Sequence, residues 1–289
     1  MTNKEERPAG CVLRLFGVPE QTVQKAVETL PDTWQGTVHC RTRGAETLVA
    51  LQSSTPQQLH RAVQQLRTSL APALYGEGEQ TLAAAAVQAL EQHRKLLVCS
   101  DAAAGALLET RLENLPGAEK VFDFGAMSYA NAALTARLSR KLRKAPQAEP
   151  ARTLARVQAM QKLTGAALAV GCVELPQSRL LLALGAAKAA GADIAVSVTG
   201  LAGPGGGDAV RPVGTVYLGA ARGDKVYVKK LFVSRPDRAL IRARAAQTAL
   251  ELALRLAQGK TPAGTQVLAE SAQHDPAALT ALDETLRAE

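Results

Sequence analysis

Aromatic residues are scarce in this 289-residue sequence, which holds four Phe, four Tyr and one Trp. Proteins that bind single-stranded nucleic acid stack the bases on aromatic side chains, and this chain could hardly supply such a platform. No basic tract with interleaved aromatics is present either. The net charge of +8 favours an anionic partner without specifying its kind. A nucleotide or another small anion is therefore favoured over nucleic acid.

Metal-binding and disulfide patterns are also missing. The four cysteines are Cys11, Cys40, Cys99 and Cys172. They form no CxxC pair, and only four histidines are present, so a zinc site is disfavoured and no cofactor is expected. No apolar stretch approaches the length of a membrane span, and the N-terminus, MTNKEERPAG, lacks the apolar segment of a signal peptide. We expect a cytoplasmic protein with reduced thiols and no membrane partner.

Alanine and leucine are abundant within a hydrophobic content of 47%, which favours a helix-rich α/β protein. Residues 1–78 predict a small, self-contained α+β domain, because strand-like and helix-like segments alternate in it. The expected strands are 11–16, 37–42 and 46–52, and the expected helices are 20–30 and 56–69. Thr55 is expected to cap the second helix, and residues 74–78 are interpreted as the link to the next domain.

Residues 79–260 predict an α/β domain, followed by a tail, 261–289, with a short helix after Pro276. Expected helices are 80–93, 106–115, 130–144, 151–163, 177–190 and 236–258, and expected strands are 95–100, 124–129, 194–198, 213–222 and 225–233. Asp101 falls shortly before a predicted helix. Its simplest role is to accept backbone N–H bonds as a cap, and a catalytic role is the alternative.

The segment Thr199–Gly207, TGLAGPGGG, carries the clearest functional signal. Five of its nine residues are glycine, and it directly follows the predicted strand 194–198. Without a Cβ the backbone can adopt positive φ and approach a ligand closely, so such a loop can direct several N–H groups at an anion. A flexible turn is the alternative interpretation. Neither a phosphate-loop lysine nor a GxGxxG pattern is present, so neither nucleotide fingerprint applies.

Three arginines, Arg235, Arg238 and Arg242, lie just before or near the start of the predicted helix 236–258. The second and third are four residues apart and share one helix face. Positive charge near a helix N-terminus opposes the helix dipole, so we expect an anion to compensate it. A bound ligand and an internal salt bridge are both open interpretations.

The glycine segment, together with RPVGTVY at 211–217, closely resembles the signature of the CinA C-terminal family, the nicotinamide-nucleotide amidohydrolases. The segment ADIAVSVT at 192–199 fits the same pattern, as do Gly125, Tyr129 and Asn131. The resemblance covers about 80–258. Residues 1–78 resemble the small KH-like domain of full-length CinA, whose large N-terminal domain is not found in this sequence.

The resemblance implies a CinA C-terminal-type α/β/α domain, preceded by a KH-like α+β domain, in a protein that forms dimers or higher homo-oligomers. It also implies release of ammonia from the carboxamide of nicotinamide mononucleotide by a serine, a lysine and a tyrosine. Tyr129 matches the family tyrosine. The ligand-binding residues that the resemblance implies are Asn131, Thr199, Gly200, Gly203, Gly205, Gly206, Gly207, Thr215, Arg238 and Arg242.

The catalytic motifs depart from the family pattern. Asp101 occupies the position of the serine in the turn after the first strand, and Ala103 that of the threonine. Glu119 falls where the second serine motif is expected, and Leu134 replaces the lysine that follows Tyr129. Because a nucleophile and its base act as a unit, losing them usually removes most of the rate enhancement. Asp101 and Glu119 could form a substitute carboxylate pair that acts on water, or serve as cap and loop residues.

Three functions therefore stay open. The leading hypothesis is a homologue with impaired chemistry that still binds nicotinamide mononucleotide or a related anion. The second is an active amidohydrolase that uses the substituted residues. The third is a nucleic-acid or protein adaptor, although Gly36 and Gly44 stand alone and form no GXXG clamp.

Overall fold

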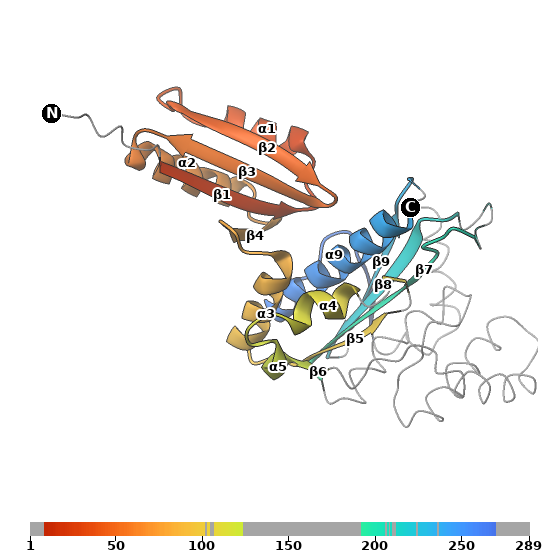
Figure 1. Cartoon of the computed structure of the whole chain (residues 1–289). Coiled ribbons are helices and arrows are strands. Elements are labelled where there is room, and N and C mark those ends of the chain that lie inside the picture. Colours follow the sequence, from red (N-terminus) through yellow and green to blue (C-terminus); the bar gives the residue numbers. More distant parts are fainter. Residues whose placement is uncertain are drawn as a thin grey trace, which may run out of the picture. The chain divides into compact units, whose positions relative to one another are not determined.

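The computed structural model describes residues 9–101, 103–104, 107–123, 192–205, 207, 209, 212–223, 225–235 and 237–269. They form a mixed α/β protein with two compact units, 1–85 and 86–289, each with its own β-sheet (Figure 1). The α/β class expected from the sequence is confirmed. The expected division after residue 78 and the observed one differ by the segment 79–85.

The first unit is a four-stranded antiparallel sheet in the order β2-β3-β1-β4, with two helices. Its elements are β1 (Ala9–Phe16), α1 (Glu20–Glu28), β2 (Gly36–Arg43), β3 (Glu46–Ser53), α2 (Pro56–Ser69) and β4 (Leu74–Glu77). This connectivity is that of the ferredoxin-like split βαβ arrangement. The KH-like assignment stays a prediction.

Alternation of buried and more exposed residues along the strands builds one core-facing side of this sheet. In β3, Val49 and Leu51 are buried, while their neighbours along the strand are partly exposed. Helix α2 begins at Pro56, as predicted, because proline suits the first turn. Thr55 holds the N-cap position but its side chain makes no capping bond; instead its N–H donates to Ser53 Oγ at 3.1 Å.

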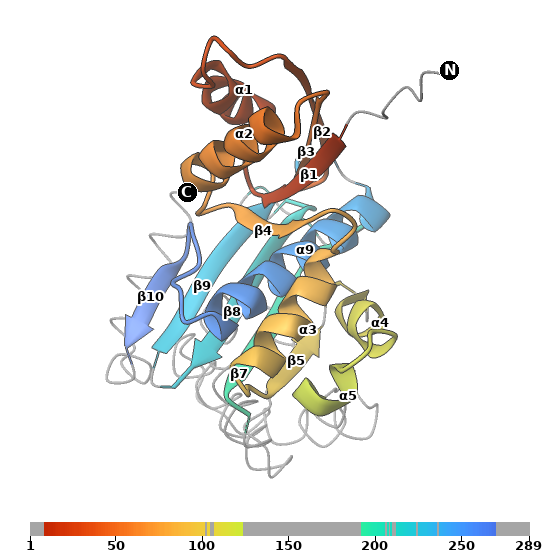
Figure 2. The ribbon, with the colours of Figure 1, turned by 90° about the vertical axis from the view of Figure 1, so that its left-hand side faces the viewer.

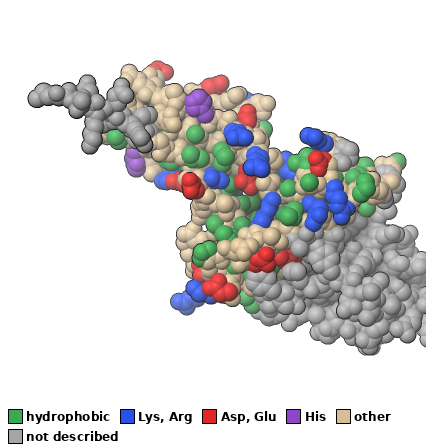
Figure 3. All heavy atoms as spheres, in the orientation of Figure 1, with side chains coloured by type: hydrophobic (Ala, Val, Ile, Leu, Met, Phe, Trp, Pro, Cys, Tyr) green, Lys and Arg blue, Asp and Glu red, His purple; other side chains and the backbone are tan. Residues whose placement is uncertain are grey.

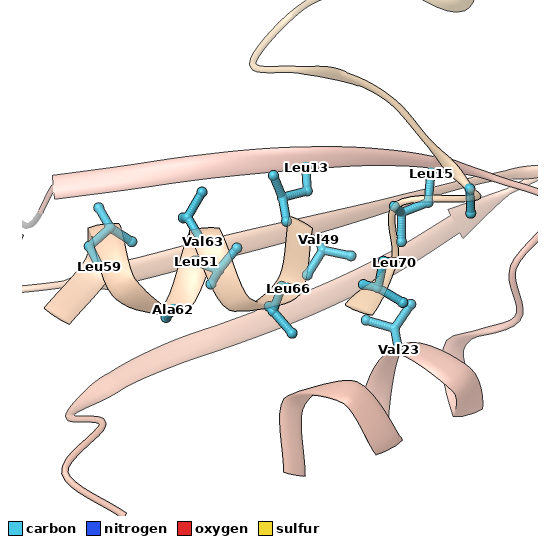
Figure 4. Packing of buried hydrophobic residues seen from close by; sticks show 11 residues of the cluster. Leu13, Leu15, Val23, Val49, Leu51, Leu59, Ala62, Val63, Leu66 and Leu70 are labelled. Carbon is cyan, nitrogen blue, oxygen red and sulfur yellow. The ribbon is translucent and has the colours of Figure 1, made fainter. Parts of the chain in front are cut away.

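The core of the first unit lies between the sheet and the helices. Figure 4 shows side chains of β1, β3 and α2 turned toward one another, with Val23 of α1 beside them. The buried cluster consists of Leu13, Leu15, Val23, Val49, Leu51, Leu59, Ala62, Val63, Leu66, Leu70 and Ala73. Fully burying one Leu or Val contributes about 1.5–3 kcal/mol, so this cluster dominates the stability of the unit.

The linker interpretation of residues 74–78 is wrong, because Leu74–Glu77 form an edge strand of the first sheet. Strand β4 pairs with β1, with Leu13 opposite Glu77 and Arg14 opposite Gly76. Arg67 of α2 also donates two hydrogen bonds of 2.5 Å to the Glu77 carboxylate. A four-residue edge strand is too short to reveal its period, so only its partner strand identifies it.

The second unit is built on a six-stranded mixed sheet in the order β10-β9-β8-β7-β5-β6. Strands β7, β5 and β6 are parallel, and the pairs from β7 to β10 are antiparallel. The described elements are α3 (Leu82–Gln92), β5 (Leu97–Asp101), α4 (Leu107–Glu113), α5 (Ala118–Val121), β6 (Phe122–Asp123), β7 (Ile194–Gly200), β8 (Thr215–Arg222), β9 (Lys225–Phe232), α9 (Arg238–Ala257) and β10 (Gln266–Ala269). Helix α3 starts in the first unit and ends in the second.

The long helix α9 packs against β7 and β8 and lies across the sheet in Figure 2. It starts at Arg238 rather than at Pro236, because Asp237 caps it. The Asp237 carboxylate accepts the N–H groups of Ala239 at 2.9 Å and Leu240 at 3.1 Å. Residues 248–257 are all buried. A helix buried on every side is an interior element rather than an amphipathic surface helix.

Other elements of the second unit differ from those expected from the sequence. Asp101 ends β5 and does not hold the N-cap position of α4. Glu119, interpreted as a possible loop residue, lies instead in the short helix α5, and β6 starts at Phe122. The tail, 261–289, contains β10, which pairs with β9. The helices predicted at 130–144, 151–163 and 177–190 and after Pro276, and the strand predicted at 124–129, lie outside the described residues.

Asp193 joins the starts of the two central parallel strands. Its carboxylate accepts the Leu96 N–H at 2.9 Å and the Lys95 Nζ at 2.9 Å. These bonds, the Leu96 N–H foremost, hold the pKa of Asp193 below its ordinary value of 3.8. A pKa that is lower in the folded than in the unfolded state stabilises the fold above the unfolded value, and this contribution is lost as pH falls through the folded value.

We expect Asp193→Ala to lower the hydrogen-exchange protection of β5 and β7 amides at pH 7 by about 3- to 10-fold, because the bonds to Leu96 and Lys95 are lost. The loss is modest because the side chains of Asp193 and Lys95 are partly exposed. Asp193→Asn keeps an acceptor for the Leu96 N–H and should have the smaller effect. The difference between wild type and Asp193→Ala should shrink as the pH falls through the lowered pKa of Asp193, because the carboxylate then becomes protonated. A difference that stays the same from pH 7 to pH 2 would contradict a role for the carboxylate charge.

Candidate functional site

The parallel strands β5 and β7 end at the same edge of the second sheet. Their register pairs Leu97 with Ile194 and Asp101 with Val198. In α/β sheets, ligands bind outside the carboxyl ends of parallel strands, where the connecting loops leave a crevice. The glycine segment follows β7 directly, so this edge is the candidate site.

The base of the glycine loop is fixed to the neighbouring strand. Strand β7 extends through Gly200, so Thr199 and Gly200 belong to the strand rather than to the loop. The Leu201 N–H donates to the Thr215 carbonyl at 2.9 Å, and the Gly214 N–H donates to the Leu201 carbonyl at 2.8 Å. Thr215, the first residue of β8, is buried. The loop therefore leaves the sheet from a defined position.

Close approach of other groups explains three of the loop glycines. A Cβ on Gly200 would lie 2.5 Å from the Thr215 carbonyl oxygen. A Cβ on Gly203, where φ is +78°, or on Gly207 would lie 2.8 Å from an atom of Val213. By contrast, no atom of the described residues lies within 4 Å of a Cβ built on Gly205. Packing against the described residues therefore does not explain the glycine at position 205.

The first two turns of α9 connect the loops that follow both parallel strands. Arg238 Nη1 donates to the Gly203 carbonyl in the loop after β7. Arg242 Nε donates to the Ala104 carbonyl after β5, at 2.9 Å. Because these arginines lie one helical turn apart, they hold the two loops at a fixed separation.

These bonds bear on the two interpretations of the arginines, a bound ligand and a salt bridge. The bonds described go from the guanidinium groups to backbone carbonyls. The anion expected at the helix start is supplied in part by Asp237, whose carboxylate caps the first turn. An aspartate just before an apolar-periodic segment is a recognised N-cap signal, which could have placed the helix start after Asp237. No sequence pattern predicts that the Ala104 carbonyl accepts a hydrogen bond from Arg242.

The structure separates the two carboxylates that could have replaced the family serines. Asp101 is the last residue of β5, at the candidate site. Glu119 is an exposed residue of α5, three residues before Phe122, which pairs with Leu97 at the opposite end of β5. Strand β5 spans about 13 Å from Leu97 to Asp101, four steps of about 3.3 Å, so the two carboxylates lie toward opposite ends of it. They therefore do not form a pair around one water molecule.

Several predicted site residues lie outside the described part of the chain. These are Tyr129, Asn131, Leu134 and Gly206. Within the described residues, no group of three or more His, Cys, Asp or Glu side chains could hold a metal ion. None of the described helices is long and apolar enough to cross a membrane.

Residues 171–257 match the CinA C-terminal domain family. A CinA-like protein of Kosmotoga olearia is 31% identical over 84% of this chain and 55% of its own length. A putative competence-damage inducible protein of Thermoanaerobacter pseudethanolicus is 30% identical over 86% of this chain and 56% of its own length. The chain belongs to the CinA family.

This CinA-family chain spans about half the length of the relatives it matches. Among solved structures, the competence/damage inducible protein CihA of Agrobacterium tumefaciens is similar, with 28% identity and a TM-score of 0.44. That match covers 61% of this chain and 93% of the other. The family assignment rests on the sequence matches, and the CinA matches include the glycine segment and α9.

Proposed function

We propose that this CinA-family chain binds nicotinamide mononucleotide, or a closely related anionic small molecule, at the ends of β5 and β7. We also propose that it has lost most of the amidohydrolase chemistry. The observation that carries the proposal is the pair of bonds from Arg238 to Gly203 and from Arg242 to Ala104, which organises cationic groups around the glycine loop. Assembly into a homo-oligomer stays a prediction.

The charges and the backbone at this edge support anion binding. A guanidinium carries five N–H donors, and the bond from Arg238 to Gly203 uses one of them. Arg238 is exposed, and no atom of the described residues lies within 4 Å of a Cβ built on Gly205. Charge-assisted hydrogen bonds to phosphate are among the stronger ones in proteins, so this combination suits a phosphorylated ligand.

The residues after β5 support the loss of chemistry. Ala103, at the position of the family threonine, is buried and has no hydroxyl. Asp101 cannot act as a hydroxyl nucleophile. Glu119 is in α5, which leads into the Phe122–Leu97 pair at the other end of β5, so it is not placed to complete a carboxylate pair. An amide hydrolase that lacks both nucleophile and base retains little rate enhancement.

An ammonia assay tests the chemistry and calorimetry tests the binding. With purified full-length chain and nicotinamide mononucleotide, we expect calorimetric binding but no ammonia release above the uncatalysed rate. Robust ammonia release that disappears in Tyr129→Phe would instead establish the second hypothesis, an active amidohydrolase. No heat with either nicotinamide or nicotinic acid mononucleotide would remove the binding proposal.

Arg242→Gln is expected to weaken binding of nicotinamide mononucleotide about 10-fold or more, because it removes a charge and the tether to Ala104. Arg235→Gln removes the same charge from an exposed position near the start of α9 and is the matched control. It should change the affinity by less than about threefold, since exposed charges are screened. Equal losses in the two variants would show that only the total charge matters and would contradict a defined site.

A further inference from the structure

Strand β2 is the longer of the two edge strands of the first sheet. It has eight residues, whereas β4 at the opposite edge has four, and the register of β4 with β1 shifts after Arg14. The register of β2 with β3 runs without interruption from Gly36 to Arg43, and β2 contains no proline. Short length, a bulge and proline are three means by which proteins block an edge against an additional strand. Strand β2 uses none of these three.

Every second residue of β2 directs its backbone N–H and C=O groups away from β3. The Thr42 N–H shows this direction, because it donates to Glu20 Oε1 of α1 at 2.9 Å. Val38 and Cys40 have the same direction, since backbone groups alternate between the two sides of an antiparallel strand. Neither residue has a hydrogen bond on this outer side among the described residues. Val38 and Cys40 therefore offer their N–H and C=O groups to an additional strand.

The side chains of β2 carry positive charge on the face of the first sheet that its helices leave open. Val38 and Cys40 pack against the core on the helix side. Because side chains alternate along a strand, His39, Arg41 and Arg43 lie on the other face, and all three are exposed. In Figure 1 the strands of the first unit lie in front of the helices, and Figure 3 shows a His side chain and Lys or Arg side chains on this face beside hydrophobic ones.

The neighbouring strand does not balance this charge. The β3 residues opposite His39 and Arg41 are Ala50 and Leu48, which are uncharged. Glu46, the acidic residue of β3, lies at the end of the strand beside the turn. Arg41 forms no ion pair among the described residues. Like charges on two copies of β2 would repel each other, so this edge favours a strand of opposite charge over a second copy of itself.

We propose that the outer edge of β2 binds an extended segment of a partner protein as a fifth strand. The segment carries acidic residues beside His39 and Arg41, and these alternate with apolar residues beside Val38 and Cys40. Val38 and Cys40 are only partly buried, so apolar neighbours remove their remaining surface from water. Backbone hydrogen bonds hold the added strand, and the acidic side chains select the partner. This surface lies in the first unit and does not depend on the nucleotide proposed for the second.

Calorimetric titration of the full-length chain with synthetic peptides tests this proposal. The probe is a peptide of about nine residues in which glutamate and valine alternate. One control peptide alternates lysine and valine, and the other has the composition of the probe but separates its glutamates and valines into two blocks. We expect the probe to bind about 10-fold or more tightly than either control at low salt. Equal binding of the two acidic peptides would show that only their net charge matters and would overturn the fifth strand.

Hydrogen exchange followed by NMR locates the bound peptide. At saturation the probe should slow exchange of the Val38 and Cys40 amides about 10-fold or more, because their N–H groups enter the new ladder. The His39 and Arg41 amides point to β3 and should change little. A saturating probe that leaves the Val38 and Cys40 amides unprotected binds elsewhere, and the proposal is then wrong.

Arg41→Glu should weaken the probe about 10-fold or more, because it replaces an attractive charge with a repulsive one. Arg61→Glu makes the same change at an exposed position of α2, on the helix side of the sheet, and should change the affinity by less than about threefold. Equal losses in the two variants would contradict the proposal. Thermal unfolding checks that both variants fold, and Arg41→Gln, with a smaller expected loss, replaces Arg41→Glu if that variant does not.

Failure of wild type to bind the probe also overturns the proposal. Sedimentation of the free protein then identifies the other occupant of the edge. A dimer whose Val38 and Cys40 amides are already protected without peptide would show that a second copy of β2 pairs there instead of an acidic partner.

Discussion

Replacing Gly214 with alanine is expected to cost about 3–5 kcal/mol of folding free energy in the second unit. Gly214 has a φ of +102°, and a Cβ there would lie 2.1 Å from the Val233 carbonyl oxygen and 3.1 Å from its carbon. These are backbone atoms, which cannot rotate away as a side chain can. The bonds that Gly214 makes to Val233 and Leu201 would be distorted, so the glycine loop should lose its anchoring together with the stability.

Gly223→Ala is the matched control in the same sheet. Gly223 also has a positive φ, +59°, but no atom of the described residues lies within 4 Å of a Cβ built on it. Its replacement should cost only about 1–2 kcal/mol, the ordinary cost of left-handed backbone for a residue with a Cβ. Urea unfolding, together with hydrogen exchange of β7 and β8 amides, measures both losses. Equal losses would mean that the backbone at Gly214 shifts to accommodate the methyl group.

Arg255→Met is expected to destabilise the second unit by about 3–5 kcal/mol, because it leaves a buried carboxylate without its cation. Arg255 Nε donates to Glu251 Oε1 at 3.1 Å within α9, and the two side chains are only 4% and 6% exposed. The other Glu251 oxygen, Oε2, is buried and has no hydrogen-bond partner among the described residues. Glu251 therefore depends on Arg255 to offset its desolvation.

The double replacement Glu251→Leu with Arg255→Met tests whether the loss in Arg255→Met comes from the unpaired charge of Glu251. Removing both charges in favour of apolar side chains of similar size should leave stability within about 1 kcal/mol of wild type. Denaturant unfolding of the two single variants and the double variant gives the coupling energy between the residues. A loss below 1 kcal/mol for Arg255→Met alone would show that water or another group solvates Glu251.

Local sequence patterns predict most described elements because those elements are long enough to show a period. The segments 20–30, 46–52 and 56–69 match α1, β3 and α2 to within a few residues. Strands β4 and β10 have four residues each and lie at sheet edges. A strand that short has no readable period, so its identity comes from the neighbour with which it pairs.

For the candidate site, too, the sequence reveals some residues but not their partners. The glycine segment and the arginines near the start of α9 stand out in the sequence, because glycine content and charge spacing are local properties. Their partners do not: Arg238 meets Gly203 across 35 residues, and Arg242 meets Ala104 across 138. The separation of Asp101 from Glu119 is likewise set by the parallel pairing of β5 with β6.

The sequence by itself therefore determines that this is an α/β protein of the CinA family with a glycine-rich loop after a buried strand, and it predicts substituted catalytic positions. These conclusions follow from composition, periodicity and motif, which depend only on neighbouring residues. Only the tertiary structure decides that α9 holds the ends of β5 and β7, that Gly214 lies against Val233, and that β2 is an edge strand of the first sheet. Those facts depend on strand register and helix docking, which are set by packing between residues far apart in the chain.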